Sequence, residues 1–328
     1  MSPDQPSSAP QDPNLAAAAE EPPAPACVMS FNASDASGAG GCAGDVATIA
    51  AMGAHALPVV ASIVMRDSAE VFDQHAIEPE AVVEQARTIL EDVTIAAWKV
   101  GFLGNADNVS AVAEVLSDYP DVPLVAYMPN LGWIDEDELQ PYLEAWRELI
   151  LPAAEVLVGN HKTLTDFLLP DWDSERAPSA RELAVAAGER GTRFVLVTGV
   201  MLPAKGGKEQ WIDNVLASPQ GAITGEKFEL FEAGFVGAGD TLSAALAALL
   251  ASGAELSDAV GEALQFLDQS LDAGFRPGMG NVIPDRFFWA LPPPDDAAAA
   301  GDEPQDAGST AAGGNDEPST PGVSRRVH

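Results

Sequence analysis

Apolar runs alternate with amphipathic helical patterns along most of the chain. Short apolar runs rich in β-branched residues predict buried strands at residues 27–31, 56–65, 95–100, 122–128, 156–158 and 193–198. Apolar positions recur at helical spacing over residues 44–52, 80–91, 106–119, 136–149, 163–168, 179–190, 241–251 and 256–271. Strands that alternate with helices predict parallel β-α-β units. We therefore expect a three-layer α/β/α domain, with a mostly parallel sheet, helices on both faces and ligands at the carboxyl ends of its strands.

The hydrophobic pattern stops near both ends of the chain. Residues 1–25 and 291–328 are rich in Pro, Ala and acidic residues, and such segments cannot bury enough apolar surface to offset chain entropy. We expect two disordered acidic tails that flank one domain over residues 26–290. Within that domain, residues 209–216 and 222–231 predict a hairpin of two edge strands.

The net charge of the chain limits the classes of molecule that it is expected to bind. The 328 residues include 50 acidic and 16 basic ones, a formal net charge of −34. Nucleic acids and anionic membranes bind through clustered Lys and Arg, so both are disfavoured. No apolar run reaches the ~18 residues of a membrane span, and the N-terminus lacks a signal-peptide pattern, so we expect a cytoplasmic location. The two cysteines, Cys27 and Cys42, suggest neither a disulfide framework nor a zinc site.

One glycine-rich stretch carries the clearest chemical signal. Gly237-Ala238-Gly239-Asp240 predicts a tight turn that leads into an Ala/Leu-rich helix. The first amide groups of a helix lack internal partners, and with the helix dipole they form an anion site. Asp240 at such a site is either an N-cap or a base that works beside a phosphate, and the stretch alone is compatible with both.

Three further stretches are weaker signals when each is taken alone. Residues 32–45 form a glycine-rich loop between the first strand and the first helix, suited to close ligand approach or to a plain flexible connection. Asp45, on the first helical turn, could simply complement the helix dipole. Lys99 ends an apolar strand and is expected to reach water along its stem. Residues 274–280 form a turn-rich loop.

Taken together, these stretches resemble the ribokinase-like superfamily, and within it the hydroxymethylpyrimidine/phosphomethylpyrimidine kinases of thiamine biosynthesis. Ala33-Ser34-Asp35-Ala36-Ser37-Gly38-Ala39-Gly40-Gly41 is similar to that family's Gly-Ser-Asp-Pro-Ser-Gly-Gly-Ala-Gly loop. Lys99-Val100-Gly101-Phe102-Leu103 resembles its Lys-Ile-Gly-Met-Leu stretch. Gly237-Ala238-Gly239-Asp240-Thr241-Leu242-Ser243-Ala244-Ala245 looks like its anion hole, and Gly278-Met279-Gly280 like its closing Gly-Ile-Gly. The resemblance covers residues 26–290.

The resemblance implies an ATP- and Mg2+-dependent kinase that acts on a small heteroaromatic alcohol, and a homodimer is expected from the resemblance only. A substrate hydroxyl would attack the γ-phosphoryl of ATP while Asp240 accepts its proton. The residues implied in catalysis are Gly237, Ala238, Gly239 and Asp240. Those implied to bind the acceptor substrate are Ala33, Asp35, Gly40, Asp45, Arg66 and Phe102. Those implied to bind ATP are Asn160, Thr198, Gly199 and Gly278, and the metal ligands are not identified.

Several positions depart from the family pattern. Arg66 stands where the family has a Gln or Glu that hydrogen-bonds the pyrimidine, and Phe102 replaces a Met. The Asn-x-x-Glu pattern tied to magnesium reads Asn160-His161-Lys162-Thr163, without the Glu. Lys-Gly-Gly-His in the nucleotide region reads Thr198-Gly199-Val200-Met201. Many pyrimidine kinases of the family carry Cys at the position of Asp240, whereas Asp is usual in pyridoxal kinases.

The substrate therefore has more than one candidate. Hydroxymethylpyrimidine and its monophosphate are the first choice, and pyridoxal or pyridoxine is the alternative within the same reaction class. A catalytically degenerate small-molecule-binding sensor is the alternative from another class. Arg66 either pairs with a substrate phosphate, which favours a phosphorylated acceptor, or is a surface arginine at a strand end.

Overall fold

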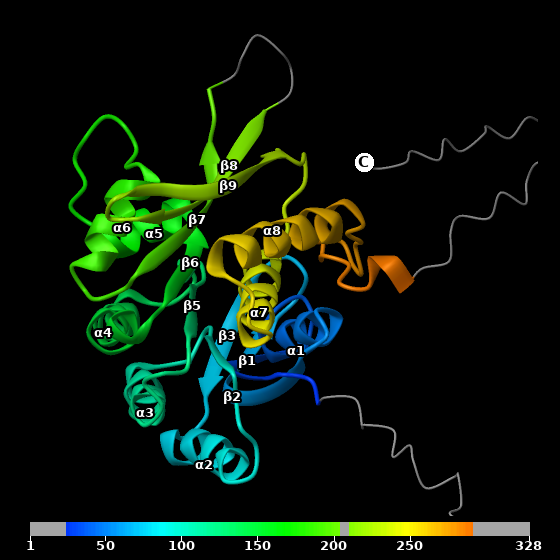
Figure 1. The fold of residues 1–328 in the computed structure, drawn as a ribbon. Helices are drawn as coiled ribbons and strands as arrows, with labels where there is room; N and C mark the ends of the chain where they lie inside the picture. Colours follow the sequence, from blue (N-terminus) through cyan, green and yellow to red (C-terminus); the bar gives the residue numbers. More distant parts are fainter. Residues whose placement is uncertain (1–23, 204–209, 291–328) are drawn as a thin grey trace, which may run out of the picture.

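A single nine-stranded sheet forms the centre of the molecule, in the order β3-β2-β1-β4-β5-β6-β7-β8-β9 (Figure 1). The computed structural model describes residues 24–203 and 210–290. The strands are β1 Cys27–Asp35, β2 His55–Arg66, β3 Val71–Ala76, β4 Ala97–Val100, β5 Leu124–Met128, β6 Val156–Asn160, β7 Phe194–Met201, β8 Trp211–Ser218 and β9 Gly221–Glu229. The six strands from β2 to β7 in this order are parallel, while β3 at one edge and β8 and β9 at the other are antiparallel.

Helices cover both faces of this sheet, as the alternating pattern predicts (Figure 1). The helices are α1 Gly41–Ala51, α2 Pro79–Leu90, α3 Ala106–Ser117, α4 Glu136–Ala145, α5 His161–Leu168, α6 Ala180–Gly188, α7 Ala238–Ala251 and α8 Leu256–Asp272. Helices α1, α7 and α8 pack on one face, and α2 to α6 on the other. In β7, Leu196 packs in the core on the side of α1, α7 and α8, whereas Val195 and Val197 pack in the core on the side of α2 to α6. The three-layer prediction is confirmed.

Helix α7 is the most deeply buried of the helices that the structure describes. Its residues from Thr241 to Leu249 are all buried. A helix that is apolar on every side must be enclosed by the protein, and α7 packs on the sheet and is flanked by α1 and α8. The N-terminus of this helix is thereby held firmly at the carboxyl ends of the central strands.

Two elements differ from the sequence-based expectation. Val71–Ala76 form β3 by pairing with β2, a strand that is absent from the predicted elements. Phe72, Asp73 and His75 are exposed there, so no apolar run marks the strand. The helix expected at 136–149 ends as α4 at Ala145 and continues as a π-helical turn over Trp146–Ile150. The predicted hairpin is confirmed as β8 and β9. The helix predicted over residues 179–190 is α6, with Ser179 as its N-cap in a capping box.

The two predicted tails fall almost wholly outside the described residues, so the domain limits of 26 and 290 stay predictions. In the part of the chain that the structure describes, none of the helices has both the length and the apolar character needed to cross a bilayer.

Candidate active site

A cavity of about 580 Å³ opens at the carboxyl ends of β1, β2 and β5, beside the N-terminus of α7. Its walls include seven of the residues that the sequence places in catalysis or substrate binding: Ala33, Asp35, Gly40, Arg66, Phe102, Gly237 and Asp240. These residues come from segments more than 200 positions apart. The sheet brings them together because parallel strands present their carboxyl ends at one edge.

The N-terminus of α7 is built for a close approach. Gly237 is the N-cap residue, with φ of +87° and no side-chain cap. A β-carbon there would overlap the carbonyl oxygen of Ala39 in the first glycine-rich loop. One on Gly239 would overlap the ring and hydroxyl of Tyr127. Asp240 is the third residue of the helix and does not cap it, so the N-cap alternative for its carboxylate is wrong.

Replacing Gly237 by alanine is expected to destabilise the fold far more than the same change at Gly253. Both glycines have nearly the same dihedral, φ of +87° and +86°, but a β-carbon on Gly253 meets nothing within 4 Å. Gly253→Ala thus measures the left-handed strain alone, about 1–2 kcal/mol. Urea unfolding of both variants checks this, and equal losses would show that the contact between the two loops is not tight.

A buried cluster of charges lies directly beneath the cavity. The Lys99 ammonium is 2.8 Å from Asp45 Oδ1 and 2.8 Å from Asp240 Oδ1. The Asn32 amide donates to both carboxylates, at 2.9 Å to Asp45 and 2.8 Å to Asp240. Ser30 donates to Asp45 at 2.5 Å. Lys99 is fully buried, so the expectation that it reaches water is wrong.

Electrostatics keep Asp240 ionised. Burial by itself would raise the pKa of Asp240, but the Lys99 ammonium and the hydrogen bonds from Lys99 and Asn32 outweigh burial and hold that pKa below its usual range. Burial likewise opposes the charge of Lys99, yet the two carboxylates raise the Lys99 pKa. Burial and the neighbouring charge of Asp240 raise the pKa of Asp45. With all three ionised, the cluster carries one net negative charge.

Asp45 does not line the cavity, in contrast to the position that the resemblance implies for a substrate ligand. Its side chain is fully buried, and both of its oxygens are occupied by Lys99, Ser30 and Asn32. The geometry therefore favours a counter-ion of Lys99, one layer behind Asp240, over direct contact with the acceptor.

The other substrate positions shape the cavity in distinct ways. Asp35 organises its own loop, since its carboxylate accepts from the Ser37 amide at 2.8 Å and from the Gly40 amide at 3.2 Å. Arg66 Nη1 lies 3.9 Å from Asp35 Oδ2, and its Nε donates to the Asp67 carbonyl. The Phe102 ring packs edge-on against Trp133, with centroids 5.3 Å apart.

Three of the four residues implied in ATP binding lie together. Asn160, the last residue of β6, is the register partner of Thr198 within β7, and a β-carbon on Gly199 would lie 2.7 Å from the Asn160 amide nitrogen. Gly278 lies elsewhere, against Ser68 in the turn between β2 and β3. Three strands separate β2 from β6 in the sheet, so Gly278 does not join the other three.

A protein-held magnesium ion does not fit these residues. Within residues 24–203 and 210–290, no group of three or more His, Cys, Asp or Glu side chains is arranged to hold a metal. Asp45 and Asp240 each use a carboxylate oxygen to pair with the Lys99 ammonium. The position expected to carry a magnesium-linked acid is Thr163, which has no carboxylate.

Sequence-based reasoning missed several residues of the site. Asn32 holds Asp45, Asp240 and the Ala33 and Phe102 amides at once. Tyr127 lies in the cavity wall, with the Lys99 ammonium 5.6 Å from its ring centroid. Arg286 contacts both glycine-rich loops from behind. A polar residue in an apolar strand marks Asn32, and the one basic residue between the pairs Ile283-Pro284 and Phe287-Phe288 is Arg286.

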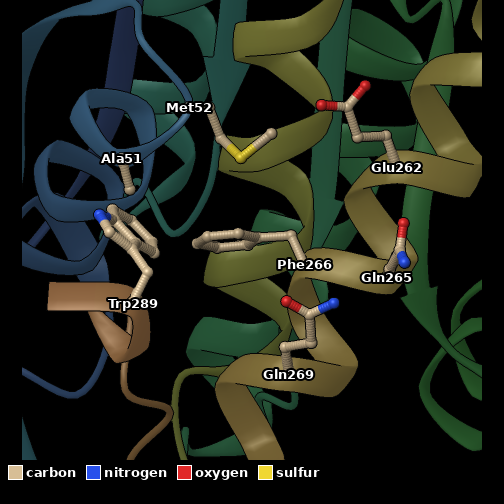
Figure 2. A pocket seen from close by; sticks show the side chains of 7 residues that line it. All are labelled: Ala51, Met52, Glu262, Gln265, Phe266, Gln269 and Trp289. Atoms are coloured by element: carbon tan, nitrogen blue, oxygen red, sulfur yellow. The ribbon is translucent and has the colours of Figure 1, made fainter. Parts of the chain in front are cut away.

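A second pocket lies away from this site, between α1, α8 and the short 3-10 turn Phe288–Ala290 (Figure 2). Its volume is about 350 Å³. The rings of Phe266 and Trp289 approach each other across it, with centroids 6.2 Å apart. None of the predicted site residues lines this pocket, so it is separate from the candidate active site.

Comparisons with known proteins identify the family of the chain. Residues 35–285 match the model of the protein family described as phosphomethylpyrimidine kinase. The chain is 29% identical over 278 residues to the hydroxymethylpyrimidine/phosphomethylpyrimidine kinase of Streptomyces coelicolor, covering 82% of this chain and 97% of that one. It is 28% identical over 253 residues to the chloroplastic thiamine biosynthetic bifunctional enzyme TH1 of Arabidopsis thaliana, which covers 75% of this chain and only 46% of the plant protein.

Among solved structures, an ADP complex of Bacillus subtilis pyridoxal kinase superposes with a TM-score of 0.69 at 22% identity, covering 82% of this chain and all of the other. At that identity the likeness concerns the fold alone, and it confirms the predicted ribokinase-like architecture.

Proposed function

Because the chain belongs to the phosphomethylpyrimidine kinase family, we propose that it is an ATP-dependent kinase of thiamine biosynthesis. Its acceptor is 4-amino-5-hydroxymethyl-2-methylpyrimidine, phosphorylated on the hydroxymethyl group or on the monophosphate. The observation that carries this proposal is the position of Asp240, an ionised carboxylate in the cavity wall at the N-terminus of α7. A cytoplasmic location and a homodimer are part of the proposal.

In the proposed reaction, the acceptor hydroxyl enters the cavity and donates a hydrogen bond to Asp240. The γ-phosphoryl of ATP lies at the start of α7, where the amides of Ala238, Gly239 and Asp240 face the charge of the transferring group. The transition state of phosphoryl transfer is loose, so the proton can leave the hydroxyl late, and a carboxylate of low pKa suffices as acceptor. Lys99 and Asn32 keep that carboxylate ionised and aimed.

The nucleotide is proposed to approach from the side of β6 and β7. Asn160, Thr198 and Gly199 lie together there. They are on the side of the sheet formed by the carboxyl ends of the parallel strands, where α7 also begins. Magnesium is expected to arrive bound to the phosphates of ATP, since Mg2+ keeps several waters and uses few protein ligands in such sites. We assign no chemical step to it.

Arg66 is proposed to bind the phosphate of a monophosphate acceptor. Its guanidinium offers five N–H donors and accepts nothing, so it suits phosphate oxygens and not a ring amino group. Among the described residues it makes one hydrogen bond, through Nε, and its side chain is 14% exposed at the cavity. Phe102 and Trp133 are proposed to hold the heteroaromatic ring.

The decisive experiment is a thermal-shift and turnover screen of hydroxymethylpyrimidine, its monophosphate, pyridoxal and pyridoxine, each with and without MgATP. A ligand that binds the native state raises the melting temperature by mass action. We expect the monophosphate to give the largest shift and to be phosphorylated. Turnover of pyridoxal alone would establish the pyridoxal kinase alternative instead. Ring ligands that bind without any ATP consumption would establish a sensor.

A further inference from the structure

Arg286 is a buried arginine that touches both glycine-rich loops of the site. Its side chain and backbone together are 5% exposed. From the guanidinium, Nε donates to the Thr241 hydroxyl at 3.0 Å and Nη2 donates to the Ala39 carbonyl. Longer bonds reach the carbonyls of Gly38 at 3.4 Å and Gly237 at 3.5 Å. Its partners thus come from the loop after β1 and from the first turn of α7.

The surroundings leave room for this guanidinium. A β-carbon on Gly44 would lie 3.0 Å from Nη2, and one on Gly237 would lie 2.9 Å from it. The Thr241 hydroxyl donates to the Gly237 carbonyl at 2.8 Å, so one hydroxyl links the guanidinium to the turn before α7. Side chains larger than hydrogen at either glycine would displace the arginine.

The backbone around Arg286 is also anchored to the approach of α7. Val282 donates to the Gly234 carbonyl at 2.9 Å, and Val236 donates back to Val282 at 3.0 Å. Asp285 donates to the Ser270 carbonyl in α8 at 2.9 Å. The guanidinium is therefore presented from a fixed segment, not from a loose end.

All direct partners of the guanidinium are neutral oxygens. In the described part of the chain, no carboxylate lies within 4 Å of it, so a simple ion pair does not explain a buried cation here. A planar fork with five donors can reach carbonyls of two loops and a hydroxyl at once, which an ammonium cannot do. The arrangement suits a residue that joins backbone segments.

We propose that Arg286 is a positioning residue, which locks the Gly38–Ala39 loop against the N-terminus of α7 and so sets the distance between the bound acceptor and the transferring phosphoryl. The proposal rests on the kinase function proposed above. It follows from the contact of the two loops: a β-carbon on Gly40 would lie 2.5 Å from Asp240 Oδ2, so a shift of the first loop moves the wall beside the base. Misplacement by about 1 Å can cost 10²-fold in rate.

The test compares Arg286→Met and Arg286→Lys with the matched control Arg147→Met. Arg147 is half-buried and donates Nε and Nη2 to the Phe167 carbonyl, at 3.1 and 2.9 Å, on the opposite face of the sheet. We expect both Arg286 variants to lose about 10²-fold in kcat at saturating substrates, with KM for the acceptor little changed. Arg147→Met should lose stability but keep its kcat.

Two further measurements separate positioning from folding. Added guanidinium ion should restore part of the kcat of Arg286→Ala at concentrations that leave the wild type unaffected. Amide hydrogen exchange of residues 37–41 and 237–243 should be faster in the Arg286 variants than in Arg147→Met, because the lock between these segments is gone. If Arg286→Met and Arg286→Ala do not fold, the kinetic and exchange comparisons are made with Arg286→Lys.

The proposal is overturned if Arg286→Met turns over like Arg147→Met, or if exchange of the two segments does not change. Absence of phosphorylation by the wild type would instead refute the kinase function, and the exchange comparison would still test the lock.

Discussion

Replacing Asp240 by asparagine is expected to lower kcat by about 10²–10⁴-fold, the usual contribution of a positioned general base. The amide keeps the size of the side chain and can still accept from Lys99, but it cannot take the proton of the acceptor hydroxyl. Because the change removes a contribution made in the transition state, KM should change far less than kcat. Steady-state kinetics with hydroxymethylpyrimidine as the acceptor, whose hydroxyl carries the proton in question, check this.

Asp258→Asn is the matched control. Asp258 is the third residue of α8, as Asp240 is of α7, so both carboxylates face the dipole of a helix N-terminus. Asp258 is exposed and lies outside the cavity. Unchanged turnover is expected from it, and unchanged turnover in Asp240→Asn would remove the base role assigned to Asp240.

Replacing Lys99 by methionine is expected to cost about 3–5 kcal/mol in the free energy of unfolding, as is typical when one partner of a buried ion pair is removed. The Lys99 side chain is fully buried between two carboxylates, and methionine would leave both without a cation. Urea unfolding at neutral pH measures the loss. A second change, Asp45→Asn, should restore part of it by removing one uncompensated charge.

Lys162→Met is the control, because Lys162 pairs with Asp166 on the surface, with side chains 82% and 63% exposed. Such a pair contributes about 0.3–0.5 kcal/mol. A Lys99→Met variant as stable as this control would show that the buried cluster is not held by charge.

The pH dependence of Lys99→Met gives a second check. The Lys99 pKa is raised in the folded protein, so its stabilising effect in the wild type is fully present below the ordinary lysine pKa and is lost as pH rises through the raised value. In the variant, protonation of the two uncompensated carboxylates at acid pH should shrink the deficit. A deficit that grows toward acid pH would contradict this charge assignment.

Much of the fold follows from local pattern. The six parallel strands each coincide with a mainly apolar run, because strands covered on both faces bury most of their side chains. Strand β3 could not be predicted in this way. Its residues Phe72, Asp73 and His75 are exposed, and only pairing with β2 makes the segment a strand.

In the candidate active site, too, some residues could be located from the local sequence pattern and others could not. Asp240 and the glycines before it could be located from sequence, since a glycine turn that opens an apolar helix predicts a candidate anion site. The roles of Lys99 and Asp45 could not, because burial of a charge depends on what packs over it. The sequence pattern predicts that the Lys99 side chain reaches water at the end of a strand, whereas in the structure it is completely buried.

The sequence by itself therefore determined the layers of the domain and the family, and it located the stretch from Gly237 to Asp240 that we propose as the place of phosphoryl transfer. Only the tertiary structure decided what Asp240 is: not a helix cap, but a carboxylate kept ionised by Lys99 and faced by the first glycine-rich loop. It also decided that Arg286 joins the two loops. The reason is physical, since a local pattern encodes backbone conformation, while the charge state of a side chain depends on neighbours hundreds of residues away.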